Sequence, residues 1–278
     1  MATTTARRPV VRFSSGARVS RPDTLAVEEP LEIRLGSGDA AEPFTVTMRT
    51  PGHDLELALG FLVAEGVVRS PSDVLAARHC PDAARDADGE PTHNVVEVVL
   101  RPGVEVPADR YRAVSSACGI CGTTSIDAVR THSSHEVAGD PLRVSGELLA
   151  ALPERLRAAQ RVFDRTGGLH AAGLFTAGGE LVVLREDVGR HNAVDKVVGW
   201  AFERGRLPLA GHVLQVSGRA SFELVQKAWT AGAPVLAAVS APSSLAVDLA
   251  VEAGLTLVGF SRGESFNVYA GAHRITGS

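Results

Sequence analysis

The hydrophobic pattern of the first half of the chain predicts short β-strands around one helix. Residues 31–35 and 44–48 alternate apolar and polar side chains, and the glycine-containing segment 36–39 between them predicts a β-hairpin. Residues 94–100 form a further predicted strand. A helix is expected to end near Gly66, because the leucines before it fall on one helical face: Leu55, Leu59 and Leu62.

The second half of the chain alternates strand and helix patterns. A helical segment over residues 148–163 comes first, and Pro153 is expected to open its second part, because proline suits the first turn of a helix. The elements predicted beyond it are, in order, strands over 170–175 and 181–184, a helix over 192–203, a strand over 212–216, a helix over 222–231, a strand over 234–239, a helix over 244–253 and a strand over 255–260. Apolar strands that alternate with helices are typical of an α/β fold with a mainly parallel sheet covered by helices.

The same pattern predicts a tail and two domains. The arginine-rich residues 1–24 are expected to form a mobile tail. Residues 25–145 are predicted to be a smaller α+β domain of strands and a helix, which ends with a cysteine-containing loop and the helix after it. Residues 146–278 are predicted to be a C-terminal α/β domain, because the composition changes near Asp140-Pro141.

Composition limits the classes of function. The chain has 278 residues, of which 45% are hydrophobic, so it can bury one large core or two of medium size. Its net charge of −4 and its pI of about 6.1 argue against a nucleic-acid-binding protein. The first residues lack an apolar export segment, no later run is long enough to span a membrane, and there are only three cysteines. We therefore expect a cytoplasmic protein in reducing surroundings.

Two of the three cysteines form the motif Cys118-Gly119-Ile120-Cys121. The residues that follow, from Thr123 to Val129, are typical of the capped start of a helix. A thiol at such a position lies near unpaired backbone N–H groups, which stabilise a thiolate. Because the thiolate is the nucleophile, this pair is a candidate site of sulfur chemistry.

Three kinds of site compete for the cysteine pair. A zinc site is disfavoured, because it needs four ligands and the remaining cysteine, Cys80, lies far upstream beside His79. No structural metal is therefore expected. A redox dithiol of the thioredoxin type and a persulfide loop, whose glycines let the sulfur travel to an acceptor, stay open as alternatives.

A second candidate site lies at the carboxyl ends of the predicted strands, where open α/β sheets bind ligands. Glycines, serines and arginines gather in four loops there: residues 185–192, 217–221, 240–244 and 259–265. Glycine and serine alone do not indicate a ligand, because turns and helix caps also favour them. The arginines in three of these loops favour an anionic, phosphorylated ligand. The sequence assigns no role to the nearby His170, His191, Lys196 and Lys227.

Together with the cysteine pair, three further motifs resemble the FdhD family of formate dehydrogenase accessory sulfurtransferases. They are Glu186-Asp187-Val188-Gly189-Arg190-His191-Asn192-Ala193-Val194-Asp195-Lys196, Ser221-Phe222-Glu223-Leu224-Val225-Gln226-Lys227 and Leu257-Val258-Gly259-Phe260-Ser261-Arg262. The four motifs stand in the family's order, and the resemblance runs from about Leu25 to Arg274.

This resemblance implies a cytoplasmic homodimer with a three-layer, cytidine deaminase-like C-terminal domain that lacks the zinc chemistry. It also implies a sulfur carrier. A cysteine desulfurase loads sulfane sulfur onto a cysteine, and the carrier passes it to the Mo-bis(molybdopterin guanine dinucleotide) cofactor before that cofactor is inserted into formate dehydrogenase.

The resemblance also implies roles for single residues. Cys118 matches the family's persulfide carrier, and Cys121 is the candidate second thiol. The segment that matches the cofactor-binding loop consists of Phe260, Ser261, Arg262, Gly263, Glu264 and Ser265, and GDP is the expected mimic of the cofactor. The chain departs from some members of the family at Gly263 and Glu264.

Two other functions stay open beside this one. The first is a non-catalytic chaperone of the molybdenum cofactor with a structural C-x-x-C motif, in which Cys118 would matter for stability rather than for sulfur transfer. The second is a redox dithiol protein, in which both cysteines would matter equally.

Overall fold

The computed structural model describes residues 3–36, 40–80, 89, 92–106, 133 and 135–277. Its strands and helices are, in chain order, β1 (Thr5–Ser14), β2 (Ala17–Ala26), β3 (Glu29–Leu35), β4 (Glu42–Arg49), α1 (Asp54–Ala64), β5 (Val74–His79), β6 (Val95–Leu100), β7 (Val144–Ser145), α2 (Gly146–Ala159), α3 (Arg161–Thr166), β8 (His170–Thr176), β9 (Leu181–Asp187), α4 (Arg190–Glu203), β10 (His212–Val216), α5 (Phe222–Thr230), β11 (Val235–Ala238), α6 (Ser244–Ala253), β12 (Thr256–Arg262), β13 (Ser265–Ala270) and β14 (Ile275–Thr276).

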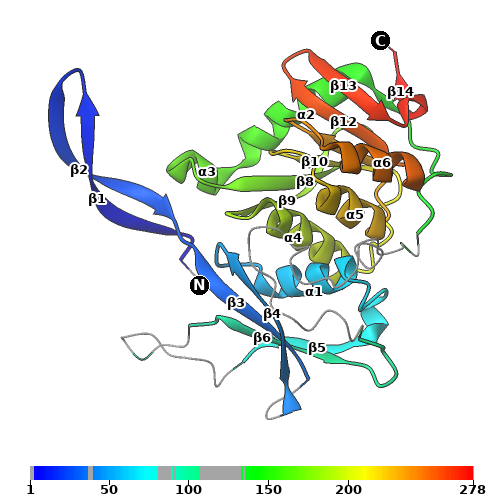
Figure 1. Cartoon of the computed structure of the whole chain (residues 1–278), viewed down its shortest axis with the longest axis horizontal. Coiled ribbons are helices and arrows are strands. Elements are labelled where there is room, and N and C mark those ends of the chain that lie inside the picture. Colours follow the sequence, from blue (N-terminus) through cyan, green and yellow to red (C-terminus); the bar gives the residue numbers. More distant parts are fainter. Residues whose placement is uncertain are drawn as a thin grey trace.

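A six-stranded sheet of order β13-β12-β11-β10-β8-β9 forms the centre of the structure (Figure 1). The central strands β10, β11 and β12 are parallel, whereas the pairs β8–β10, β8–β9 and β12–β13 are antiparallel. The α/β fold class is confirmed, but the expectation of a mainly parallel sheet is wrong outside the three central strands. The reason is that β8–β9 and β12–β13 are joined by short turns, whereas a parallel pair needs a long crossover.

Helices cover both faces of this sheet, because successive residues of its strands point to opposite sides. In β10, Val213 packs in the cluster that contains the leucines of α2, and its neighbour Leu214 packs in the cluster that contains α4, α5 and α6. The same alternation holds for Leu257 and Val258 of β12. The result is three layers, with α2 on one side of the sheet and α4, α5 and α6 on the other (Figure 1).

A smaller sheet of order β4-β3-β6-β5 carries helix α1, and α1 packs directly on α4 of the larger sheet (Figure 1). The two helices meet backbone to backbone. A Cβ atom on Gly60 would lie 1.8 Å from the Asp195 carbonyl oxygen, and one on Gly199 would lie 1.8 Å from the Glu56 carbonyl oxygen. Only glycine fits at these two positions, and a single hydrophobic cluster runs through both sheets. The domain boundary near residue 145 stays a prediction.

Most of the expected tail has regular secondary structure. Strands β1 and β2 pair antiparallel, and Ser15 and Gly16 join them with φ angles of 50° and 80°. Two successive positive φ angles are typical of a type I′ turn, which suits the twist of a two-stranded ribbon. The hairpin projects from the rest of the molecule (Figure 1), and Phe13 near its turn is 76% exposed. A hairpin without a buried face has no regular alternation of apolar and polar residues, so the sequence did not predict it. Its mobility stays a prediction.

Pro153 lies inside helix α2, so the expectation that it opens a second helix is wrong. The helix begins after Ser145, whose hydroxyl accepts a hydrogen bond from the Leu148 N–H, and the break before α3 falls at Gln160. Because proline lacks an N–H, the carbonyl of Leu149, four residues earlier, has no helical donor. A side chain of the sheet supplies the donor, as described below.

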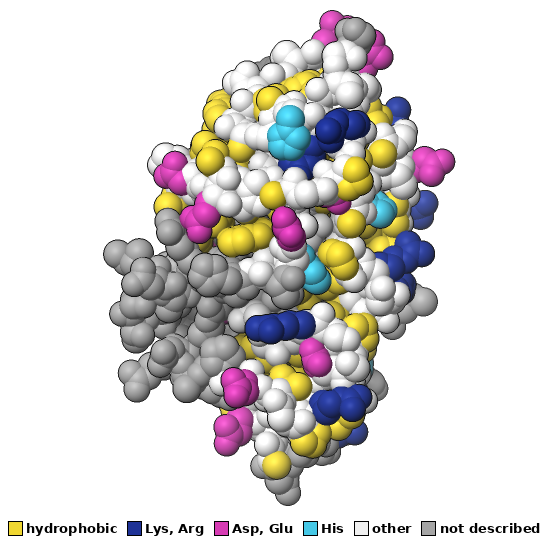
Figure 2. Space-filling model, turned by 90° about the vertical axis from the view of Figure 1, so that its right-hand side faces the viewer, with side chains coloured by type: hydrophobic (Ala, Val, Ile, Leu, Met, Phe, Trp, Pro, Cys, Tyr) yellow, Lys and Arg dark blue, Asp and Glu magenta, His cyan; other side chains and the backbone are white. Residues whose placement is uncertain are grey.

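The surface of the described part of the molecule is of mixed character. On the face shown in Figure 2, basic and acidic side chains are scattered among hydrophobic ones. No helix in the described ranges is long and apolar enough to cross a membrane.

Candidate functional site

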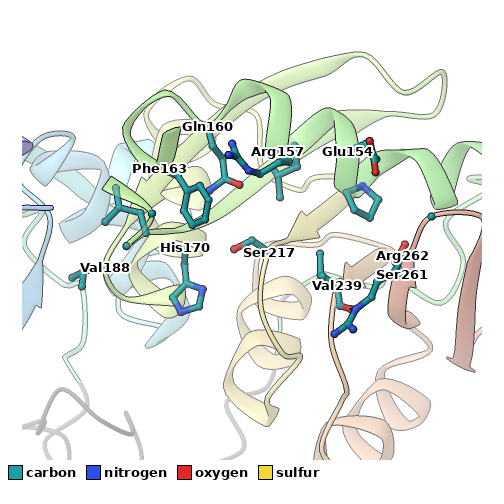
Figure 3. A pocket seen from close by; sticks show the side chains of 16 residues that line it. Glu154, Arg157, Gln160, Phe163, His170, Val188, Ser217, Val239, Ser261 and Arg262 are labelled. Atoms are coloured by element: carbon teal, nitrogen blue, oxygen red, sulfur yellow. The ribbon is translucent and has the colours of Figure 1, made fainter. Parts of the chain in front are cut away.

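A cavity of about 680 Å³ opens at one edge of the six-stranded sheet. Its floor consists of residues at strand ends, namely His170 of β8, Val188 after β9, Ser217 after β10, Val239 after β11, and Ser261, Arg262 and Gly263 at the end of β12. Its roof comes from α2, α3 and the break between them, with Glu154, Leu156, Arg157, Gln160 and Phe163. Figure 3 shows the roof residues above the strand ends, with the hollow between them.

The topology of the sheet explains why a cavity forms here. The parallel strands β10, β11 and β12 all end at this edge, which is where open α/β sheets bind ligands. The antiparallel neighbours bring the start of β8 and the end of β9 to the same edge. Small-molecule pockets measure about 300–1,000 Å³, so this cavity has room for a ligand of nucleotide size. That the ligand is anionic stays a prediction.

A carboxylate from the sheet holds the roof in place. Glu186 of β9 accepts hydrogen bonds from the backbone N–H groups of Val162 and Phe163, at 2.9 and 2.8 Å. These N–H groups belong to the first turn of α3 and have no partner within the helix, so Glu186 acts as their cap. The Arg157 guanidinium lies over the Phe163 ring, with 4.5 Å between Cζ and the ring centroid. The aromatic wall of the cavity is thereby fixed from two sides.

The six residues of the predicted cofactor-binding loop do not all lie in the same place. Ser261, Arg262 and Gly263 line the cavity, and Gly263 and Glu264 line a neighbouring hollow beside α2. The remaining two, Phe260 and Ser265, line neither of these hollows. The Ser261 side chain is fully buried and its hydroxyl donates a hydrogen bond of 3.3 Å to the Leu149 carbonyl.

Phe260 and Arg262 are exposed at the end of β12. Phe260 has a φ angle of 53°, which is rare for an aromatic residue, and 42% of its surface is exposed. The Arg262 Nε donates to the Val239 carbonyl at 3.2 Å, and this contact directs the guanidinium along the floor of the cavity. A cation therefore lies at the strand-end side of the hollow.

Most polar residues of the motif 186–196 support the fold. The fully buried Asp187 accepts hydrogen bonds from the Thr50 and Gly189 N–H groups at 3.1 and 2.8 Å. Its Oδ2 also lies 2.7 Å from the ammonium of Lys196, which donates to the Thr50 carbonyl at 2.8 Å. These contacts join the end of β9 to the residues between β4 and α1. The burial and charge of Asp187 and Lys196 are therefore accounted for by contacts within the fold, without a ligand.

Lys227 has a structural partner as well. Its ammonium lies 2.7 and 2.9 Å from the two carboxylate oxygens of Asp195, and both side chains are buried. Burial raises the pKa of Asp195, and the charge of Lys227 opposes that rise. This pair connects α4 to α5 at the level of the α1–α4 contact.

The two histidines near the strand ends have different surroundings. His191 Nε2 lies 2.8 Å from the Glu223 carboxylate and 3.2 Å from the Ser221 hydroxyl. Burial acts to raise the pKa of Glu223, but the hydrogen bond and charge of His191, with Lys227 and Arg190, lower it on balance. His170 lines the cavity, and burial, followed by the charges of Arg190 and His191, lowers its pKa. These surroundings favour the neutral form of the His170 imidazole.

The cysteine pair Cys118 and Cys121 lies outside the described residues, so its roles stay predictions. The third cysteine, Cys80, is buried and free. Within the described ranges, no group of three or more His, Cys, Asp or Glu side chains is arranged to hold a metal ion. The absence of a structural metal stays a prediction too, because the cysteine pair is not part of those ranges.

Sequence reasoning missed the roof of the cavity. The pattern of residues 148–163 predicts only a packed helix, and its leucines do pack on the sheet. The signal for a site was the break at Gln160, followed by Phe163 and then by Gly167-Gly168, which also line the cavity. A helix that ends in an aromatic residue and two glycines brings open backbone close to a ligand.

Comparison with known proteins agrees with the resemblance in the motifs. The chain matches the FdhD/NarQ family over residues 26–276. It is 60% identical to the sulfur carrier protein FdhD of Streptomyces coelicolor, over 99% of this chain and 97% of that protein. It is 56% identical to the sulfur carrier protein FdhD of Mycobacterium tuberculosis, over 98% of this chain and 99% of that protein.

A solved structure has the same fold. The crystal structure of a candidate formate dehydrogenase accessory protein from Desulfotalea psychrophila matches with a TM-score of 0.77 and 24% identity. The match covers 99% of this chain and all of that one. The overall fold of the chain is therefore one that an experimental structure also has.

Proposed function

Since this chain belongs to the FdhD/NarQ family, we propose that it is a sulfur carrier in the maturation of formate dehydrogenase. In this role it is a sulfurtransferase of the cytoplasm. It takes sulfane sulfur from a cysteine desulfurase and delivers it to its substrate, the Mo-bis(molybdopterin guanine dinucleotide) cofactor, before that cofactor enters formate dehydrogenase.

Cys118 carries the sulfur in this proposal. Its thiolate attacks the outer sulfur of a persulfide on the desulfurase, so that a new S–S bond forms while the old one breaks and the desulfurase cysteine leaves as a thiolate. Sulfane sulfur passes from one thiolate to another, and neither an oxidant nor a reductant is consumed. In the delivery step the acceptor would supply the electron pair for its new bond to the outer sulfur, the S–S bond of the persulfide would break, and Cys118 would leave as a thiolate. Cys121 is the candidate second thiol beside it.

The observation that carries this proposal is the cavity at the strand ends. Its floor includes Ser261, Arg262 and Gly263, which belong to the segment that matches the family's cofactor-binding loop. The Arg262 guanidinium suits a phosphate, and Gly263 has a φ of 57° with open space around its Cα, so its backbone is accessible to a ligand. The cavity has the size of one nucleotide, and we propose that it binds one guanine nucleotide part of the cofactor, for which GDP is the mimic.

Sulfur loading tests the proposal directly. After incubation with a cysteine desulfurase and cysteine, the intact mass of the wild-type protein should increase by one sulfur atom. Cys118→Ala should gain none while keeping its thermal stability, and Cys121→Ala, the matched control, should still gain it. Normal activation of formate dehydrogenase by Cys118→Ala would contradict the proposal. Equal loss in both variants would favour a redox dithiol, and a loss of stability with normal loading would favour a structural motif.

We also propose that the chain is a homodimer, as the family resemblance implies. Light scattering during size-exclusion chromatography measures the mass in solution. A mass of one chain at micromolar concentrations would contradict this part of the proposal.

A further inference from the structure

The roof of the cavity contains a buried amide that the fold does not use. Gln160 lies at the break between α2 and α3, and only 3% of its surface is exposed. Its backbone is engaged, since its N–H donates to the Arg157 carbonyl and its own carbonyl accepts from the Asp164 N–H, both at 3.2 Å. Its side-chain Nε2 is covered and has no hydrogen-bond partner among the described residues.

An unused amide at this place is unfavourable for folding. A buried polar group without a partner lowers stability, and native proteins pair nearly all such groups. Methionine has almost the same length and shape as glutamine and would fill the space without that penalty. A residue that breaks a packing rule without a structural benefit is expected chiefly at a functional site.

The surroundings of Gln160 fit a flat ring. It lies beside Arg157 and Phe163 on the roof of the cavity (Figure 3). Phe163 is fixed by the stacked Arg157 guanidinium and by the cap that Glu186 provides to α3. An aromatic ring next to an amide offers a heterocycle both of the contacts that it needs, stacking against its face and hydrogen bonding at its edge.

The chemistry of the amide defines the edge that it can bind. A glutamine side chain presents a donor and an acceptor side by side, and its soft terminal torsion allows either atom to turn toward a ligand. The complement is a lactam edge, in which a C=O stands next to an N–H. Guanine and pterin rings both have this edge. Across the cavity, on the floor, Arg262 supplies the cation that a phosphate needs.

We propose that Gln160 recognises the lactam edge of a planar heterocycle, guanine or pterin, whose phosphates extend toward Arg262. This inference rests on the proposed function, because the molybdenum cofactor is a ligand that carries such rings and phosphates together. Gln160 is then a residue that determines affinity for the ring, whereas Arg262 determines affinity for the phosphates.

Binding by the full-length protein tests this division of roles. The ligands are GDP, 6-hydroxymethylpterin diphosphate and inorganic pyrophosphate, measured by calorimetry with wild type and Gln160→Met. Loss of the two neutral hydrogen bonds to the lactam edge should weaken binding of the ring-bearing ligand about tenfold or more. Pyrophosphate binding should stay the same, and the melting temperature should stay equal or rise, because an unpaired buried amide has been removed. The ring-bearing ligand that wild type prefers identifies the source of the lactam edge.

Gln215→Met is the matched control. Gln215 is fully buried in β10, does not line the cavity, and donates from Nε2 to the Val216 carbonyl at 3.0 Å. Its Oε1 is buried without a partner as well, so it shares the unpaired amide atom of Gln160 but not the cavity. Replacement of Gln215 should therefore leave GDP binding unchanged, whereas Gln160→Met should weaken it.

Three results would overturn the inference. They are unchanged binding of both ring-bearing ligands by Gln160→Met, an equal loss of pyrophosphate binding, or a lowered melting temperature. Failure of wild type to bind either ring-bearing ligand would overturn it as well. In that case sulfur loading on Cys118, measured without any nucleotide, still decides whether the proposed sulfur carrier role holds.

Discussion

The hydroxyl of Ser261 donates a hydrogen bond to the carbonyl oxygen of Leu149, the one carbonyl of α2 that Pro153 deprives of its helical donor. The contact spans 3.3 Å and joins the end of β12 to the helix above it. This contact fixes the position of a floor residue, Ser261, relative to a roof helix of the cavity, α2. Ser261 therefore contributes to the site by fixing its shape, since its side chain is already engaged by the fold.

Ser261→Ala should lower the free energy of unfolding by about 1–3 kcal/mol, because the buried Leu149 carbonyl would lose its donor. Urea unfolding measures this change. Ser265→Ala, on the next strand of the same hairpin, is the matched control, because its hydroxyl is exposed. Equal stability of both variants would mean that the contact contributes nothing.

Arg262→Ala should weaken GDP binding about tenfold or more, because a charge-assisted hydrogen bond to phosphate contributes about 1.5–3 kcal/mol. Arg219→Ala is the control, since Arg219 is an exposed arginine of a neighbouring strand-end loop that does not line the cavity. Cys118 should load with sulfur normally in both variants. If both bind GDP equally well, Arg262 is not part of the site.

Gly60→Ala should destabilise the protein by about 1–3 kcal/mol or more, because a Cβ atom there would collide with the Asp195 backbone. Gly146→Ala, also in a helix, should be tolerated, because the nearest atom to its Cβ would be 3.7 Å away. Thermal unfolding of the two variants compares them. A Gly60→Ala protein as stable as wild type would show that α1 and α4 can move apart.

Lys227→Met should cost about 3–5 kcal/mol, because it leaves the buried carboxylate of Asp195 without a counter-charge. Replacing both partners, with Asp195→Leu and Lys227→Met together, should recover most of that loss. Arg34→Ala is the control, since its pair with Glu32 is partly exposed and should contribute about 1 kcal/mol or less. No recovery in the double variant would show that the pair does more than neutralise its own charges.

His170 should contribute a loss of stability as the pH drops below about 6.5. Burial, with the charges of Arg190 and His191, lowers its pKa in the folded state, so the unfolded chain takes up the proton first. His170→Asn should therefore lose less stability than wild type between pH 7.5 and pH 5.5 in urea unfolding. The lowered pKa values of His53, His79 and His135 act in the same direction in both proteins. An identical pH dependence would contradict a lowered pKa of His170 in the folded protein.

The elements of the sheet with two buried faces were the easiest to predict from sequence. Strand β10 and helices α5 and α6 lie within one residue of their expected limits, because apolar runs and the glycine at 254 mark them clearly. The hairpin of β1 and β2 lacked such a signal, since neither of its faces is buried. The prediction at Pro153 was wrong for another reason. The helical hydrogen bond that Pro153 removes from α2 is replaced by one from Ser261, a residue more than one hundred positions away in the sequence.

The strand-end half of the site could be predicted, and the helical half could not. The loops after β10 and β12 follow strands directly, so the rule for open sheets finds them. Gln160 and Phe163 reach the cavity through the packing of α2 on the sheet and the cap from Glu186, which are long-range contacts. The role of Lys196 and Lys227 also depends on partners far away in sequence, and only the structure reveals them.

The glycine contact between α1 and α4 has a consequence for motion. With Gly60 and Gly199 holding two backbones in direct contact, the helices have no compressible side-chain layer through which the two sheets could pivot. The sheets should therefore travel as one body, and no hinge should open between them during a turnover cycle. Rearrangement on binding should then be confined to the rim of the large sheet. Amide hydrogen exchange should be slow across α1 and α4 with or without ligand, and should respond to GDP in α3 and in the residues around Gly263.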